Sequence, residues 1–556
     1  MKEINQLKER LSQGRITRRD FIRSAIALGV ALPTATSLSS AVLAATPNKG
    51  GMLRQALTGG ASSDSLDPAT YLDSYMINVG MGQLRNNLTE IDENNQLIPE
   101  LAESWDTSDG QTWVFELRQG VEFHNGRSLK ASDVVASIQH HLGEKTKSAA
   151  KGIVSPITNI MAHGDHQVMM VLDGPNADFP YLMSDYHLGI CPANDDGTID
   201  TQSGIGTGGY KLESFDPGVR TLTVRNPNYW KAGRAHFDSI ETLFISDTGA
   251  RENGLMSDEL DFITSPAAAT AARLGKRPGI EVFYTNGNQH CTLPMLNNVS
   301  PFNDNNVVMA LKHAINRQEW LEKIWFGYAS LGNDIPIGPA NRYRATNEEI
   351  PQRDYDLDKA KYYMKQAGRS SVDLQISVAD TAFQNSDDAC VLFQETARPA
   401  GINIEVVRKP DDGYWSNVWL VDPWCASYWG GRPTEDWMFS QVYSKNAIAT
   451  GWSETFFDNP RFEELLPQAR AELDDTKRRE MYVEMQNIVH DNCSVIIPIF
   501  SAYGHAITDK VARPKIMASN WGHDGEKNAE RWWFAGSVNN LKFVAAASAA
   551  AFFGAR

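Results

Sequence analysis

The sequence predicts a mixed α/β protein with two or three domains. Residues 113–117 and 221–224 are short runs of apolar, aromatic and β-branched side chains, which are typical of β-strands. Residues 461–470 and 475–490 instead place their apolar side chains at helical spacing. Because a chain of 556 residues is too long for one hydrophobic core, these elements are expected to divide into several lobes.

Other elements are predicted from the residues at their ends. Asp358 is expected to cap the start of a helix that Gly368 ends. Residues 424–433 indicate a buried strand that runs into a turn, and residues 495–500 a strand after the helix that precedes them. The Ala-rich residues 544–556 are predicted to be a poorly ordered tail.

The N-terminal segment predicts export from the cytoplasm. Arg18 and Arg19 precede a bulky apolar residue and a further arginine, which is the twin-arginine pattern. The following stretch, residues 25–45, contains Gly, Pro, Thr and Ser and is weaker than a membrane span, and small residues at 42–44 offer a cleavage point. Residues 1–45 are therefore interpreted as a removable signal peptide; an ordinary amphipathic helix is the alternative.

The charge of the chain argues against nucleic acid as a partner. The net charge is −16, and the predicted signal contributes a positive surplus, so the mature chain carries about −20. Binding to a phosphate backbone needs clustered Lys and Arg, which such an acidic chain does not favour.

Cysteine usage gives little support for a disulfide framework. The five cysteines are Cys191, Cys291, Cys390, Cys425 and Cys493. An odd, scattered set leaves at least one cysteine free, and a single disulfide, for which Cys291 with Cys425 is one pairing, remains open. None lies near the predicted cleavage point, so we expect no lipid anchor and a freely diffusing periplasmic protein.

Four stretches of the sequence together carry a resemblance to known proteins. The strongest is Pro-Glu-Leu-Ala-Glu-Ser-Trp at 99–105, continued by 109–126 and by Lys-Ala-Ser-Asp-Val at 130–134. Further matching stretches are 206–211 with 225–230, where Gly209 replaces the usual proline, then 297–317, and the segment 475–500. These stretches resemble the extracellular solute-binding proteins of family 5.

The resemblance implies a two-lobed α/β periplasmic binding protein, of the Venus-flytrap type II cluster C class, with an extra domain inserted in the first lobe. The expected division is lobe I at 46–93, 209–298 and 506–543, the extra domain at 94–208, and lobe II at 299–505. The resemblance implies a monomer that captures a peptide-like or other polar small solute by lobe closure and delivers it to the permease of an ABC importer. Neither chemistry on the solute nor a cofactor or metal is implied.

Two alternatives stay open: an exported hydrolase acting on a similar solute, and a nickel or glycan receptor of the same fold. The sequence lacks Gly-x-Ser-x-Gly, His-Glu-x-x-His and the P-loop pattern. Ser148 and Lys151 fit Ser-x-x-Lys without its companion motifs, and a solvated loop is favoured. His140 and His141 are adjacent and face different sides of a predicted helix, and His124 is expected to make a structural hydrogen bond.

An aromatic-rich segment, residues 414–452, is the predicted location of the ligand pocket. Trp and Tyr bring large rigid surfaces with one polar group, although about half of these rings are expected to serve as core. In the peptide-binding relatives, the resemblance places an aspartate for the peptide's ammonium group at the end of the matching strand. Here that position falls near Gly431, or Ser427 in the other register, and neither is acidic, which counts against simple peptides.

Arg432 offers a planar charged fork suited to a carboxylate or phosphate, and a salt bridge with Glu435 or Asp436 is the alternative. A polar or zwitterionic ligand such as a modified peptide, an opine-like conjugate or a small glycan is therefore favoured. The predicted ligand-binding residues are Ser63, Asp64, Ser65, Asn297, Tyr428, Trp429, Gly431, Arg432, Asp436 and Phe500.

Replacing Arg18 and Arg19 together with lysine should leave the uncleaved precursor in the cytoplasm, because the twin-arginine pattern is read by a receptor and not by bulk charge. Cell fractionation followed by immunoblotting measures the precursor and mature forms. An unchanged periplasmic yield would contradict the twin-arginine interpretation and indicate the general secretory route.

Overall fold

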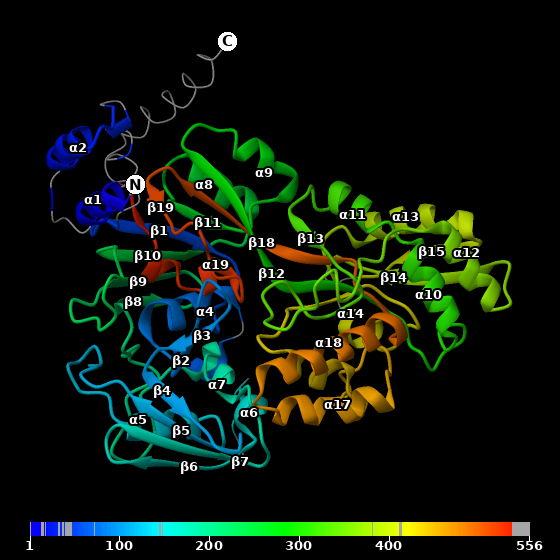
Figure 1. Ribbon diagram of the computed structural model, residues 1–556, viewed down its shortest axis with the longest axis horizontal. Helices are drawn as coiled ribbons and strands as arrows, with labels where there is room; N and C mark the ends of the chain where they lie inside the picture. The colour runs from blue at the N-terminus through cyan, green and yellow to red at the C-terminus, as the bar shows by residue number, and fades with distance from the viewer. Residues whose placement is uncertain are drawn as a thin grey trace.

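The chain folds into two lobes that lie side by side, as predicted (Figure 1). The computed structural model describes residues 2–12, 16, 18–31, 34–35, 38, 47–71, 73–143, 146, 148, 150–380, 382–410 and 414–535. The predicted cleavage point at 42–44 and the predicted tail at 544–556 lie outside these residues. Near the N-terminus, α1 (Lys2–Ser12) and α2 (Arg18–Ala27) pack on each other, and Arg18 and Arg19 open α2.

The first lobe is built on most of a ten-stranded mixed sheet. Its order is β16 (Ser427–Trp429), β12 (Ile280–Pro294), β18 (Ile499–Thr508), β11 (Phe262–Thr264), β1 (Met52–Leu57), β10 (Ser239–Phe244), β9 (Arg220–Arg225) and β8 (Tyr210–Asp216), while β13 (Ala329–Leu331) pairs with β18 and β17 (Val495–Ile496) with β12. β1 runs parallel to β10 and β11, and the other pairings are antiparallel. Helices α4 (Ser74–Val79), α8 (Thr248–Met256) and α9 (Ala268–Leu274) accompany this sheet.

A separate four-stranded antiparallel sheet forms the lower part of the first lobe in Figure 1. Its order is β4 (Ala102–Asp106), β5 (Thr112–Leu117), β7 (Gln167–Leu172) and β6 (Ile157–His163), with α5 (Ala131–Gln139) alongside. Along β5 the residues are alternately buried and half-buried, so one face of the sheet forms its own core with Phe115, Met170 and Val134. The sheet lies within residues 94–208, and the domain boundaries themselves stay a prediction.

The second lobe contains a parallel β-α-β unit and a set of helices. β14 (Val372–Val378) and β15 (Ile402–Arg408) are joined by α13 (Ser386–Ala397). The longer helices are α10 (Asn305–Ala314), α12 (Leu357–Gln366), α17 (Pro460–Ala471) and α18 (Asp475–Asn492). Shorter elements of the chain are α6 (Lys151–Val154), α7 (Phe179–Leu182), α11 (Arg317–Lys323), α14 (Tyr414–Asn417), α15 (Glu435–Met438), α16 (Lys445–Thr450), α19 (Gly522–Gly525), α20 (Asn528–Arg531), β2 (Thr89–Ile91), β3 (Leu97–Pro99), β19 (Val511–Ala512) and β20 (Trp533–Phe534).

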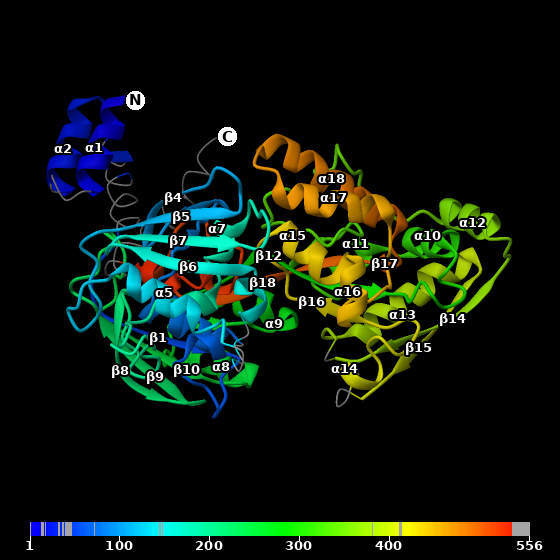
Figure 2. The same ribbon diagram turned by 90° about the horizontal axis from the view of Figure 1, so that it is seen from below.

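Two strands connect the lobes. β12 and β18 pair in an antiparallel ladder from Ile280↔Thr508 to His290↔Phe500, with one irregularity between Asn286 and His290. Figure 2 shows both strands passing from one lobe to the other. This arrangement confirms the implied pair of α/β lobes joined by two strands.

Local structure corrects two sequence-based predictions. The cap of α12 is Asp356 and not Asp358, because only the side chain of Asp356 stands three residues ahead of the Lys359 amide that it accepts from, at 2.9 Å. The predicted strand 495–500 is divided into β17 and the start of β18, because Pro498 cannot donate to a ladder. The predicted stop of α12 is confirmed, with Gly368 in the left-handed region at φ 69°.

All five cysteines are buried and free, so the pairing of Cys291 with Cys425 is wrong. Cys291 lies on β12 opposite Tyr428. Cys425 instead pairs through its backbone, in an isolated β-bridge, with Ser377 of β14. Separately, none of the helices in the described part of the chain has the length and apolarity needed to cross a membrane.

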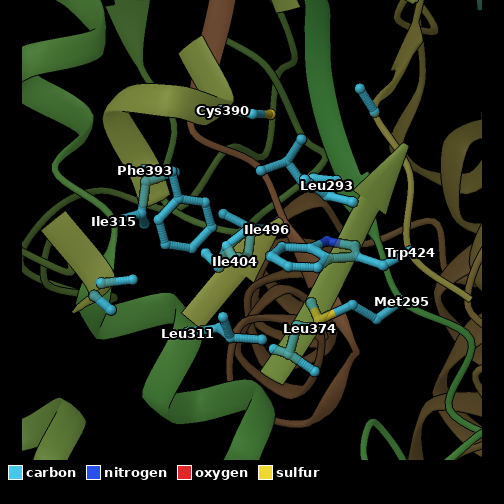
Figure 3. Close-up of a cluster of buried hydrophobic side chains, with 14 of the residues drawn as sticks. Leu293, Met295, Leu311, Ile315, Leu374, Cys390, Phe393, Ile404, Trp424 and Ile496 are labelled. Atoms are coloured by element: carbon cyan, nitrogen blue, oxygen red, sulfur yellow. The ribbon is translucent and has the colours of Figure 1, made fainter. Parts of the chain in front are cut away.

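Trp424 occupies the centre of the second lobe's core. Figure 3 shows its indole beside Leu293, Ile496 and Met295, and its ring lies 5.9 Å from the rings of Phe302 and Phe393. Its exposed fraction is 1%. The segment 424–426 is therefore held by apolar packing, and the chain that follows starts from a fixed position.

Trp424→Ala should lower the free energy of unfolding by about 3–5 kcal/mol, because it leaves a cavity in this core. Trp452, which is 46% exposed, provides the control, and Trp452→Ala should cost less than about 1 kcal/mol. Urea denaturation followed by circular dichroism measures both. Equal losses in the two variants would contradict the placement of Trp424.

Candidate functional site

Three aromatic side chains meet where β12 enters the second lobe. His290 of β12 pairs with Trp429 of β16 on one side and with Phe500 of β18 on the other. Residues directly opposite in neighbouring strands point to the same face, so the three rings share one face of the sheet. The rings of His290 and Phe500 lie 5.1 Å apart. The region that joins the lobes therefore carries three buried aromatic rings on one face of the sheet.

The turn after β16 presses closely on β12. Gly431 has φ 75°, and a Cβ at this position would lie 2.5 Å from the Cβ of Asn288. Asn288 accepts a hydrogen bond from the amide of Ala340 at 2.8 Å, and Asn341 donates one to the carbonyl of Arg432 at 2.9 Å. Only glycine fits here. The packing of the turn against β12 therefore fixes the backbone position of Arg432, the next residue.

The guanidinium of Arg432 lies among neutral groups. It donates to Oε1 of Gln441 and to the carbonyl of Gly431, both at 2.7 Å, and it lies over the rings of Trp429 and Trp437 at 5.7 and 5.5 Å. The alternative salt bridge with Glu435 or Asp436 is wrong. Glu435 accepts from the amide of Tyr343, and Asp436 pairs with Arg470 at 2.9 Å.

Arg432 also faces the first lobe. Burial lowers its pKa, and the nearby Tyr186 and Asp185 of the first lobe act in the opposite direction. Asp185 is itself held by His187 at 2.6 Å, and Tyr186 packs on the ring of Trp521. Tyr186 of the first lobe and Arg432 of the second therefore lie near each other where the lobes meet.

A second set of contacts closes the lobes together away from the connecting strands. Asp178, just before α7, forms a buried ion pair with Arg478 of α18 at 2.7 Å. Arg342 donates to the hydroxyl of Tyr181 at 3.3 Å, and the amide of Ala177 donates to the carbonyl of Arg470 at 2.9 Å. These contacts join the extra sheet of the first lobe to the helices of the second.

A cavity of about 510 Å³ lies beside these contacts. Its walls come from residues 152–182 of the first lobe and from 436–470 of the second, with Trp437, Ser440 and Leu182 among the lining residues. Asp436 lines it as well, paired with Arg470. The interface between the lobes thus contains space for a small molecule next to charged groups.

Glu435 is buried at the same interface without a cation bonded to it in the part of the chain that the structure describes. Burial, and then the negative charge of Asp178, raise its pKa to about 7. Because Asp178 belongs to the first lobe, closure of the lobes contributes to this shift.

The structure brings together four of the predicted site residues, Trp429, Gly431, Arg432 and Phe500, and separates the others. Asp436 lines the cavity described above, and Tyr428, 41% exposed, points to the opposite face of β16 from Trp429. Asn297 lies past the end of β12, where its backbone N–H donates to the backbone carbonyl of Thr455 at 3.1 Å.

Ser63, Asp64 and Ser65 form a turn within the first lobe. Asp64 accepts from the amide of Ala61 at 2.8 Å, and the hydroxyl of Ser65 accepts from the amide of Asp67 at 3.1 Å. Their hydrogen bonds remain within this lobe, so their role in binding stays a prediction.

A carboxylate does lie beside Ser427, the alternative position of the missing acidic residue. Glu454 accepts hydrogen bonds from Ser427 Oγ at 2.6 Å, from Trp419 Nε1 at 2.7 Å and from Thr292 Oγ1 at 3.1 Å. Burial raises its pKa. The sequence analysis missed Glu454 because this residue comes from a later loop. The side chain of Trp415, in the aromatic segment 414–452, lies outside the described residues.

The remaining polar motifs have structural partners. His124 Nε2 lies 3.0 Å from the carbonyl of Gly208, which confirms the expected structural hydrogen bond. Ser148 is buried, and not in a solvated loop, because its Oγ lies 2.6 Å from Nδ1 of His141. His140 instead contacts Asp67 at 3.0 Å. Within the described ranges, no three His, Cys, Asp or Glu side chains are grouped so as to hold a metal ion.

Comparison with known proteins identifies the family. Residues 96–450, which are more than half of the chain, match the model of the family described as "Bacterial extracellular solute-binding proteins, family 5 Middle". The chain belongs to this family. The resemblance that the sequence carries is therefore confirmed, and the two lobes are those of a family 5 solute-binding protein.

Individual relatives of this solute-binding protein are distant in sequence and close in fold. Di/tripeptide-binding protein 2 of Pseudomonas aeruginosa is 25% identical over 469 residues, covering 78% of this chain and 86% of the relative. The periplasmic binding protein DppA of Helicobacter pylori, solved with the peptide STSA, has 23% identity and a TM-score of 0.69 over 88% of this chain and 99% of its own. HbpA2 of Haemophilus parasuis has 22% identity and a TM-score of 0.75, covering 85% and 98%.

The residues whose side chains contact the other lobe could not have been found from the sequence. Asp178 and Arg478 are 300 positions apart, and neither belongs to a motif. Tyr186 and Arg342 carry no local signal either, because what distinguishes them is a contact with the other lobe.

Glu435→Gln should change how the stability of this solute-binding protein depends on pH. The folded pKa near 7 exceeds the ordinary value of 4.5, so the stability linked to this group is complete below pH 4.5 and is lost as the pH rises through 7. Between pH 5.5 and 8, the melting temperature of the wild type should fall by roughly 2 °C more than that of the variant. The exposed Glu480→Gln is the control and should follow the wild type; parallel curves for all three proteins would contradict the shift.

Proposed function

We propose that this protein is the periplasmic substrate-binding component of an ABC importer. It captures a peptide-like or other polar small solute between its lobes and delivers it to a membrane permease. The observation that carries the proposal is the pair of lobes joined by β12 and β18, with polar and aromatic side chains facing each other across the join. Membership of the solute-binding family supports it, as does the name of the di/tripeptide-binding relative.

Capture proceeds by hinge closure. Two connecting strands allow the lobes to turn relative to each other, and contacts made only in the closed form determine how far the equilibrium moves. Asp178 with Arg478 and Tyr181 with Arg342 are such contacts. A solute that bridges Tyr186 and Arg432 adds to them, so binding and closure strengthen each other.

The aromatic rings where β12 enters the second lobe supply the apolar part of the site. Trp429 and Phe500 offer flat faces, and the neighbouring polar groups fix the orientation of a solute. No covalent step is required for this role. Export by the signal at residues 1–45 places the protein in the periplasm, where it acts as a monomer beside the permease.

A solute retained from the cell should be detectable by native mass spectrometry of protein purified without denaturation. Its mass and fragmentation separate a peptide, a glycan and a nickel complex. A solute returned unaltered supports capture, whereas a chemically altered product that accumulates in proportion to the purified protein would favour the exported hydrolase.

Refolded protein, freed of solute, should gain about 2.7 kcal/mol of stability when the released solute is added back at a hundredfold excess over its dissociation constant. Trp429→Ala should weaken binding at least tenfold through lost apolar contact, whereas Tyr362→Ala, on the exposed surface of the second lobe, should not. Thermal unfolding and calorimetric titration measure both. Equal affinities would remove Trp429 from the site.

A further inference from the structure

We propose that the captured solute carries an oxyanion, a carboxylate or a phosphate, which is held between Arg344 and Arg432 of the second lobe. The inference rests on the proposed function and narrows its ligand class. It adds Arg344, which the sequence does not single out, and it is carried by the positions and partners of these two guanidinium groups.

Arg344 is a partly buried cation without a counter-ion. Its guanidinium lies 4.9 Å above the ring of Phe500, and across the described residues it has neither a hydrogen-bond partner nor an ion-pair partner. Burial lowers its pKa to about 10, and no acidic group among the described residues acts against this shift. Because the side chain is not fully enclosed, a ligand can reach it.

Arg432 is also left without a full set of partners. Its Nε and Nη1 donate to neutral acceptors, Gln441 and the carbonyl of Gly431. Its Nη2 donates to no group among the described residues. The one carboxylate that acts on it, Asp185 of the first lobe, is already bonded to His187 at 2.6 Å.

A continuous set of contacts places the two arginines on either side of His290. Arg344 covers Phe500, Phe500 contacts His290, His290 pairs with Trp429, and Arg432 covers Trp429. Both arginines are near enough to His290 to lower the pKa of its imidazole. In addition, Asn341, three residues before Arg344, bonds the carbonyl of Arg432.

His290 does not supply the missing negative charge, nor does it add a third cation. Burial, followed by Arg432 and Arg344, lowers its pKa to about 4, so it is neutral at neutral pH. Its Nδ1 lies 2.9 Å from the carbonyl of Asn288, and its buried Nε2 has no partner in the described structure. Among the described residues, the site therefore keeps two guanidinium groups that form no ion pair with a carboxylate.

Other buried arginines of the second lobe are neutralised. Arg317 and Arg353 both contact Asp334, at 2.7 and 2.6 Å, and Arg478 contacts Asp178. Removing a guanidinium from water without a partner is unfavourable, and an anion bound between two of them offsets that cost. The planar forks of Arg344 and Arg432 match the oxygen geometry of a carboxylate or a phosphate.

The test uses solute-free refolded protein and simple probes at matched ionic strength in chloride. The probes are inorganic phosphate, succinate and the dipeptide Ala-Ala, with succinamide and Ala-Ala amide as the counterparts that lack the carboxylate. Thermal unfolding is measured against probe concentration for the wild type, Arg344→Gln, Arg432→Gln and Arg369→Gln. Arg369 is an exposed arginine of the same lobe, so its variant controls for net charge.

We expect at least one oxyanion probe to raise the melting temperature of the wild type and of Arg369→Gln. Where that probe is a carboxylate, its amide counterpart should not raise it. Each of the two site variants should need at least a tenfold higher concentration for the same shift. A stronger response to phosphate than to both carboxylates assigns a phosphorylated solute, and the reverse assigns a carboxylate.

Three results would overturn the inference: no oxyanion probe stabilises the wild type, the amides act as well as the acids, or both site variants respond like the wild type. The wild-type comparison of acid with amide remains decisive if a variant fails to fold. The identity of the solute released from natively purified protein shows whether only the anion site or also the proposed function is wrong. A released solute without an acidic group contradicts the anion site and leaves solute capture intact.

Discussion

The antiparallel pairing of β12 with β18 is the interaction on which the rest of the structure depends. β18 pairs with β11 of the first lobe and with β13 of the second, and β12 pairs with β16 and β17 of the second lobe. The irregularity between Asn286 and His290 lies where the strands pass from one lobe to the other. A join of only two strands lets the lobes turn relative to each other, while the ladder fixes which residues stand at the join.

The chemistry at the join follows from that register. His290 is held between Trp429 and Phe500 because β16 and β18 flank β12 at this point. The close packing of Gly431 on Asn288 fixes the backbone position of Arg432. Apolar packing around Trp424 fixes the segment that leads into β16. This grouping of aromatic rings arises from strand order, and not from any short motif.

Closure is a balance of charges across the lobes. Asp178 attracts Arg478 and at the same time raises the pKa of Glu435, so one carboxylate both favours contact and makes it depend on pH. At the join the balance is different, because neither Arg344 nor Arg432 forms an ion pair with a carboxylate of the described residues. The first region is complete in the protein alone, whereas the second is completed by an anionic solute under our proposal.

The sequence by itself determined the mixed α/β class, the family and several helices and strands, because periodicity and end signals such as Gly368 act over a few residues. It also indicated Trp429 and Arg432, since they lie in one aromatic segment that matches the family. Only the tertiary structure decided that Arg432 makes no salt bridge with Glu435, and that Arg344 stands near it. Such partners are set by which strands pair and how the lobes meet, and contacts between distant residues leave no local trace in the order of the amino acids.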